Sequence, residues 1–143
     1  MTYDQLTNRE FAYFCVRGIG QHEVITNIIG MNPHEAYSDD DVNPRTAKPW
    51  GCMLWRLNSG LDDKEPLERH VAALMLWLNR IPGAIKRISE EYELMLQCVG
   101  YFPGMGHGAH LDRETIRVLG QLGIAVDLDF YFVDDHGHTA EMR

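Results

Sequence analysis

The clearest change of hydrophobic pattern along the chain lies between Leu111 and Val133. Before Gly123, apolar residues recur every three or four positions, which is typical of one side of an amphipathic helix. This apolar stripe consists of Ile116, Val118, Leu119 and Leu122. Asp112 is a good N-cap, because its carboxylate can accept hydrogen bonds from the free amides of the first turn. Gly123 can adopt the left-handed conformation that ends a helix, so we expect a helix between these two residues.

After Gly123 the period of the pattern falls to two, which predicts a strand. The apolar side of this strand consists of Ile124, Val126, Leu128, Phe130 and Phe132. The other side carries Ala125, Asp127, Asp129, Tyr131 and Val133. Alternate residues of a strand point to opposite sides of a sheet, so the final strand is expected to have one apolar and one acidic side.

Similar reasoning predicts the remaining elements. The expected strands are 11–17, 35–37, 50–57 and 92–102, and the expected helices are 22–29, 67–81 and 85–91. Strand 11–17 is apolar on both sides, which favours a central place in a sheet. Pro82 and Gly83 break the long helix. The polar stretch 38–49, which contains three consecutive aspartates, predicts an exposed loop.

The resulting order is β-α-β-β-α-β-α-β. Its first six elements have the order of the ferredoxin-like split β-α-β arrangement, so we predict an α+β fold with a mainly antiparallel sheet and helices on one face. The C-terminal helix and strand would extend this core. A mixed sheet with another strand order is the alternative. With 143 residues, the chain has the size of one domain, and we expect 1–9 and 134–143 to be peripheral.

The charge of the chain restricts the partners that it could bind. It has 13 Lys and Arg against 21 Asp and Glu, a net charge of -8. A nucleic-acid-binding surface needs a cationic patch, so this balance argues against nucleic acid as a partner and fits a basic protein instead. The N-terminus lacks the pattern of a signal peptide, and no apolar run is long enough to span a bilayer.

Three cysteines, Cys15, Cys52 and Cys98, lie within apolar stretches that resemble strands. An odd number of cysteines in such positions predicts buried, reduced thiols and a cytoplasmic location.

Several stretches together resemble an uncharacterised bacterial family, domain of unknown function 4279. The resemblance is carried by 14–30 leading into Pro33, by Trp55 with the later Ser59-Gly60-Leu61, by the long helix from Leu67, and most specifically by 119–124 running into Asp127-Leu128-Asp129-Phe130-Tyr131. It implies a single α+β domain from a bacterial cytoplasm. It implies no reaction, cofactor or catalytic residue. The polar insert 39–48 and the histidine-bearing loop depart from the family pattern.

Asp127 and Asp129 are the first candidate for a binding site, since two carboxylates on one side of a strand lie about 7 Å apart. Such a pair can bind a cation or transfer protons. The competing interpretation is that they face solvent, or that they pair with Arg56 or Arg17 on neighbouring strands. We favour this interpretation, because a magnesium or calcium site needs more oxygen ligands than this stretch offers.

Histidines form the second candidate. His107 and His110 lie in a glycine-rich loop, and His136 and His138 lie near the C-terminus. Histidines at such spacing can bind zinc, but zinc sites usually have a rigid scaffold and often a thiolate ligand. We therefore expect a surface loop, with no metal and no cofactor.

Aromatic residues form the third candidate. Trp50, Trp55 and Tyr101 could form part of a partner surface, because aromatic side chains often dominate such surfaces, although simple core packing is the commoner role. Combined with the acidic groups, they predict a non-catalytic protein-interaction domain that binds a basic partner such as a toxin. The acidic contact candidates are Asp39 to Asp41, Asp62, Asp63, Asp127 and Asp129.

Two other functions stay open. One is an enzyme or small-ligand or metal-binding protein with a site formed by Asp127, Asp129 and the loop from His107 to His110. The other is a homo-oligomer assembled through an exposed strand or the tryptophans.

Overall fold

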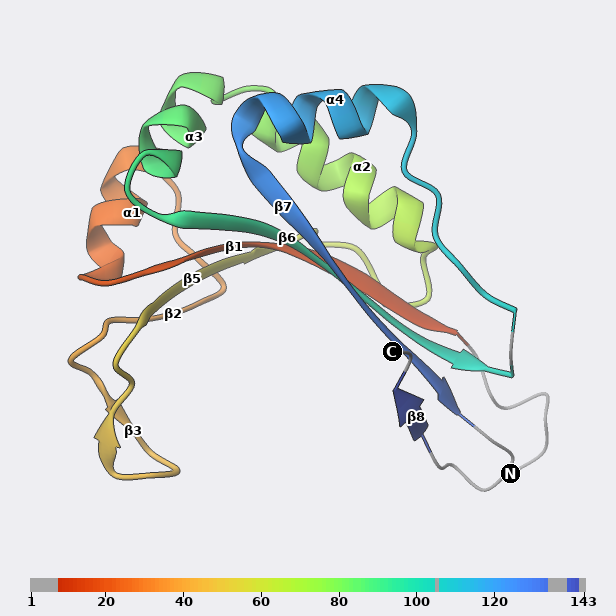
Figure 1. Ribbon diagram of the computed structural model, residues 1–143, viewed down its shortest axis with the longest axis horizontal. Coiled ribbons are helices and arrows are strands. Elements are labelled where there is room, and N and C mark those ends of the chain that lie inside the picture. Colours follow the sequence, from red (N-terminus) through yellow and green to blue (C-terminus); the bar gives the residue numbers. More distant parts are fainter. Residues whose placement is uncertain (1–7, 105, 134–138, 142–143) are drawn as a thin grey trace.

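Residues 8–104, 106–133 and 139–141 are described by a computed structural model (Figure 1), and within them four helices and eight strands are present. In chain order the elements are β1 (Arg9–Gly18), α1 (His22–Ile29), β2 (Glu35–Tyr37), β3 (Val42–Asn43), β4 (Lys48–Pro49), β5 (Met53–Asn58), α2 (Leu67–Leu78), α3 (Pro82–Ser89), β6 (Glu93–Pro103), α4 (Arg113–Leu122), β7 (Ile124–Val133) and β8 (Thr139–Glu141).

Six strands form one sheet in the order β2-β5-β1-β6-β7-β8. Neighbouring strands are antiparallel except β6 and β7, which are parallel and are connected through α4. The predicted α+β class with a mainly antiparallel sheet is therefore confirmed. β1 lies between β5 and β6, as its apolar sequence predicted.

The helices lie over one face of the curved sheet (Figure 1). Because only one face of the sheet is covered by the described helices, side chains along each strand alternate between the core and the uncovered face. Ala12, Phe14 and Val16 of β1 point into the core that the sheet shares with the helices. Phe11 and Tyr13 point to the opposite side and are only half-buried. The helices and strands thus share one hydrophobic core, and the second face of the sheet has no described helix over it.

The α4–β7 unit has the ends that its sequence predicted. The Asp112 carboxylate accepts a hydrogen bond from the backbone N–H of Thr115 at 2.8 Å. Gly123 ends α4 in the left-handed conformation, with φ 72° and ψ 32°. The apolar stripe is narrower than expected, since Ile116 is 58% exposed while Leu119 and Leu122 are buried.

Three local expectations were wrong. Cys52 is exposed, because β5 begins at Met53, three residues after the predicted start, and Cys52 lies before it. Leu128 of the apolar side of β7 is 51% exposed. The polar stretch 38–49 contains a short hairpin, in which Val42 pairs with Pro49 and Asn43 with Lys48.

Candidate functional site

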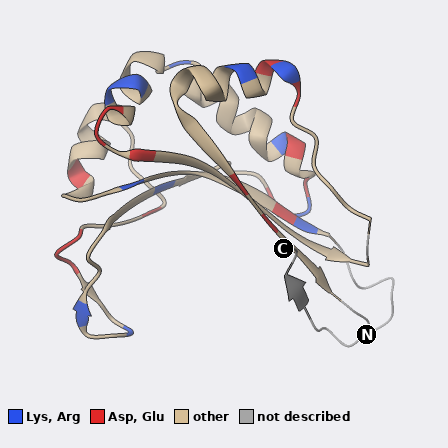
Figure 2. Ribbon diagram, viewed as in Figure 1, with Lys and Arg blue, Asp and Glu red and all other residues tan. Residues whose placement is uncertain are grey.

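We call the side of the sheet opposite the helices the open face. Its residues line up in rows across the strands, as the pairing registers show. The rows are Arg9, Tyr101 and Tyr131; Phe11, Val99 and Asp129; Asn58, Tyr13, Gln97 and Asp127; and Arg56, Cys15, Met95 and Ala125. Aromatic, cationic and acidic side chains therefore share this face, with acidic groups on β7 and cationic groups on β1 and β5 (Figure 2).

A chain of stacked rings crosses the open face. The Tyr101 and Tyr131 rings stack with centroids 4.9 Å apart and planes at 15°. The Phe11 ring lies 6.4 Å from that of Tyr101 and 6.2 Å from that of Tyr13. Such rings provide rigid apolar area with polar hydroxyl groups, which is common at protein interfaces.

Arginine guanidinium groups of the same chain lie over two of these rings. The Arg9 guanidinium carbon lies 4.6 Å from the centroid of Tyr101. The corresponding distance from Arg56 to Tyr13 is 4.5 Å. Arg56 also forms an ion pair of 3.0 Å with Glu35 on β2. The rings of this face are thus suitable for contact with guanidinium groups.

The two predicted aspartates lie together on the open face of β7. Asp127 is exposed, whereas Asp129 is half-buried and accepts a hydrogen bond from the side-chain amide of Gln97. Asp129 therefore has a different partner from the arginines considered from the sequence. Its negative charge reaches Tyr13, whose pKa is raised by burial first and by the nearby Cys15 and Asp129, while Arg56 acts in the lowering direction.

The three predicted aromatic contacts lie in different environments. Trp55 is fully buried, and its indole N–H donates to the Thr26 hydroxyl at 3.0 Å, so it belongs to the core. Trp50 stacks on Tyr37 with centroids 4.0 Å apart. Tyr101 lies on the open face.

The histidine loop lies away from the two aspartates. His107 stacks on Phe102 at 4.6 Å, and Phe102 belongs to the core shared with the helices. The backbone N–H of His110 donates to Glu68 in α2. Asp127 and Asp129 point to the other side of the sheet, so the structure does not bring the two groups together.

Among the described residues, no three His, Cys, Asp or Glu side chains are close enough to bind one metal ion. His136 and His138 lie outside the described residues.

The acidic block 39–41 is used to build a turn. Asp39 accepts from the backbone N–H of Gly20 at 2.9 Å, and Asp41 accepts from that of Ser38 at 2.7 Å. Asp40 accepts from the Gln21 side chain at 2.9 Å. Asp39 and Asp40 thus connect the start of α1 to the segment after β2, and Asp41 stabilises the turn itself, so this block has a structural role.

A serine–histidine pair was missed by the sequence analysis. His70 is fully buried in α2, with Nδ1 2.6 Å from the Ser59 hydroxyl and Nε2 3.2 Å from the carbonyl of Glu65. A carbonyl can only accept, so Nε2 donates to it, and in the neutral imidazole Nδ1 then accepts from the Ser59 hydroxyl. The sequence indicates the burial of His70 in one way: it lies three residues after Leu67, on the side of α2 that carries the buried apolar residues.

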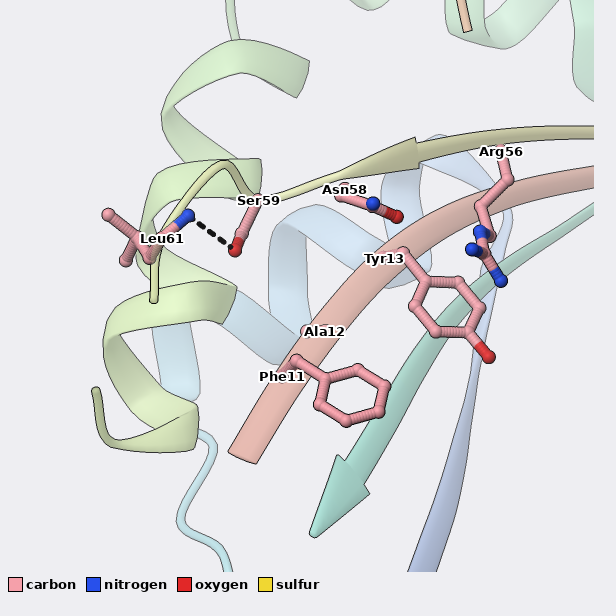
Figure 3. A pocket seen from close by; sticks show the side chains of 7 residues that line it. All are labelled: Phe11, Ala12, Tyr13, Arg56, Asn58, Ser59 and Leu61. Atoms are coloured by element: carbon pink, nitrogen blue, oxygen red, sulfur yellow. Dashed lines mark hydrogen bonds between the residues drawn. The ribbon is translucent and has the colours of Figure 1, made fainter. Parts of the chain in front are cut away.

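Two cavities adjoin the end of β5. One has a volume of about 430 Å³ and is lined by Phe11, Ala12, Tyr13, Arg56, Asn58, Ser59 and Leu61. The other, about 240 Å³, lies where Met31, His34 and Trp77 meet Asn58 and Ser59. The first cavity opens on the open face and combines rings, a guanidinium, an amide and a hydroxyl (Figure 3).

Comparison with known proteins identifies a family. A family model described as a domain of unknown function (DUF4279) matches residues 7–133, so the chain belongs to this family, as the resemblance indicated. No curated protein and no solved structure matches the chain. No helix in the described part of the chain is long and apolar enough to cross a membrane.

Proposed function

We propose that this member of the DUF4279 family is a non-catalytic interaction domain, and that the β6–β7 half of its open face binds a protein with exposed arginine or lysine side chains. We define the contact surface as Tyr101, Tyr131, Asp127 and Asp129. The observation that carries the proposal is the position of an exposed carboxylate, Asp127, on the same sheet face as a stacked tyrosine pair.

The other acidic candidates are less suited to a partner. The carboxylates of Asp39 to Asp41 already accept hydrogen bonds from groups within the chain. Asp62 accepts from the backbone N–H of Lys64 at 2.8 Å and shapes the turn before α2. By contrast, Asp127 lies in the middle of a long strand, on the same face as the two tyrosines and next to Gln97 of β6.

A cationic partner fits the charge and the rings together. The net charge of -8 would attract a basic protein from a distance and speed its association, an effect that salt would weaken. At short range, tyrosine faces bind guanidinium groups, as Arg9 already does over Tyr101. Tyrosine is also one of the residues that most often dominate interface energies.

An enzyme built on Asp127, Asp129 and the histidine loop finds less support. Catalysis would need these groups within hydrogen-bonding reach of one substrate. The aspartates and His107 lie on opposite sides of the sheet. Self-association through sheet edges is also less favoured, since the edge strands β2 and β8 are three residues each.

We also infer that β1, β2, β5 and β6, with the helices that connect them, form a ferredoxin-like split β-α-β core. Support comes from the order β2-β5-β1-β6 with antiparallel neighbours, in which the two β-α-β crossovers place β1 and β6 side by side. A cytoplasmic location is part of the same proposal, supported by free thiols at Cys15, Cys52 and Cys98.

Affinity capture with matched variants tests the proposed function. The wild-type chain, Asp127→Asn and Tyr101→Ala would be incubated with an extract of the organism that encodes it, and bound proteins quantified by mass spectrometry. Glu90→Gln is the control, because it removes the same charge from an exposed position at the end of α3. Sedimentation of the purified chain at several concentrations would detect self-association.

We expect a basic protein to be recovered with the wild type and Glu90→Gln, and to be reduced at least about tenfold by either open-face variant. Equal loss with Glu90→Gln would show that net charge alone is responsible. Such an equal loss would contradict the proposal. Recovery that the open-face variants leave unchanged would also contradict it, and so would self-association without any other bound protein.

A further inference from the structure

We propose that the cavity between β1, β5 and the turn after β5 binds a small, flat aromatic carboxylate, with Arg56 as its anchor. This site lies on the β1–β5 half of the open face and is separate from the β6–β7 contact surface. The inference therefore does not depend on the proposed protein partner.

The cavity has the size and walls of a small-molecule site. Its volume of about 430 Å³ falls in the range of ligand pockets. Phe11 and Tyr13 form one wall, with ring planes at 19° to each other. Figure 3 shows the two rings side by side along β1, with Arg56 beside Tyr13 and with Ser59 and Leu61 toward the other end. A flat apolar body fits against two nearly parallel rings.

Arg56 supplies the anchor for an anion. Its side chain is 30% exposed, and one terminal nitrogen pairs with Glu35 at 3.0 Å. Its Nε is buried and has no hydrogen-bond partner among the described residues. A buried N–H without an acceptor costs free energy, which a ligand oxygen would recover. A guanidinium can also bind both oxygens of one carboxylate.

The charge around Arg56 favours a carboxylate over a phosphate. Arg56 is the sole cation among the described residues that line the cavity, and Glu35 already neutralises part of its charge. A dianionic phosphate would be repelled by Glu35 and by the net charge of the chain, whereas a singly charged carboxylate suits one partly neutralised guanidinium.

Ser59 gives the far end of the cavity a defined polarity. Its hydroxyl donates to His70 at 2.6 Å and accepts from the backbone N–H of Leu61 at 3.2 Å. The proton of the hydroxyl then lies in the bond to His70, and the oxygen, which lines the cavity, keeps one lone pair that can accept a further hydrogen bond. This oxygen accepts a hydrogen bond, so a ligand with a hydroxyl group opposite its carboxylate fits better than one without it.

Protein-observed NMR titration with 4-hydroxybenzoate, benzoate, cyclohexanecarboxylate and phenyl phosphate tests the inference. The wild type is compared with Arg56→Gln and with Arg17→Gln, a control that removes a charge from the same face of β1 outside the cavity. Asp127→Asn shows whether the site is independent of the contact surface. Dispersion of the amide spectra confirms that each variant is folded.

We expect 4-hydroxybenzoate to bind tightest and to shift the signals of residues around Tyr13 and Asn58. Arg56→Gln should weaken its binding at least about tenfold, while Arg17→Gln and Asp127→Asn change it less than about twofold. Tighter binding of phenyl phosphate or cyclohexanecarboxylate, shifts centred elsewhere, or equal binding by folded Arg56→Gln would overturn the inference. Loss of protein capture by Asp127→Asn would leave it unaffected.

Discussion

Burial strongly raises the thiol pKa values of two cysteines, Cys15 and Cys98. Burial raises the pKa of Cys15 to about 11 and that of Cys98 to about 12. The thiolate is the reactive form, so both should be almost inert toward a disulfide reagent at pH 8. Cys52 is exposed and should react. We predict rapid reaction of about one thiol per folded chain, abolished by Cys52→Ser, and reaction of all three in denaturant. Equal rates for the three thiols in the folded chain would contradict the burial of Cys15 and Cys98.

The phenol of Tyr13 reports on the charges of the open face. Burial and Asp129 raise its pKa, whereas Arg56 acts in the lowering direction because a cation stabilises the phenolate. Replacing Arg56 with glutamine removes that cation, so the pKa of Tyr13 should rise further. Titration of ¹³C-labelled tyrosine, assigned with Tyr13→Phe, would measure it, with Arg17→Gln as the control. A pKa of Tyr13 that does not rise in the Arg56 variant would show that the guanidinium does not stabilise the phenolate.

The roles of single residues could be predicted from the sequence only where their hydrogen-bond partners lie a few residues away. Asp112 and Gly123 were predicted correctly, because caps depend on neighbours a few residues away. The use of Asp39 to Asp41 could not be predicted, since two of their hydrogen-bond partners, Gly20 and Gln21, lie 19 residues away. The Ser59–His70 pair likewise depends on how the turn after β5 packs against α2.

Gly120, inside α4, and Gly123, at its C-terminal end, allow the end of this helix to be tested by substitution. Gly123 has φ 72°, a conformation that costs an alanine about 1 kcal/mol. Gly120 lies inside the helix, and an added Cβ would contact nothing within 4 Å. Gly123→Ala should therefore lower the free energy of unfolding by about 1 kcal/mol, while Gly120→Ala should raise it by about 0.5 to 1 kcal/mol. Chemical denaturation measures both. Equal effects of the two substitutions would contradict the left-handed helix end.

The helices and strands could be predicted from the local pattern of apolar residues, but their arrangement in space could not. Strands 35–37 and 124–133 were predicted with the bounds that the structure shows. The β3–β4 hairpin was missed, because its strands are two residues each and have no period to detect. Strand order depends on contacts between distant segments, such as β1 beside β6, so the sequence left a mixed sheet open as an alternative.

At the scale of the whole molecule, the sheet separates two environments. One face forms the core with the helices (Figure 1), and the other carries tyrosines, arginines and aspartates. This separation explains why residues that are close in the sequence, such as Phe102 and Tyr101, have different roles. It also explains why Asp129 and His107 cannot serve one reactive site, although both were reasonable candidates from the sequence.

We propose that the β6–β7 half of the open face is the surface that binds cationic groups, and NMR mapping with a defined probe can locate that binding. An eight-residue arginine peptide would be titrated into ¹⁵N-labelled wild type, Asp127→Asn and Glu90→Gln. We predict the largest amide shifts along 99–102 and 127–131, and weaker binding with Asp127→Asn but not with Glu90→Gln. Shifts centred on 39–41 or on the helices, or equal weakening by both variants, would contradict the claim.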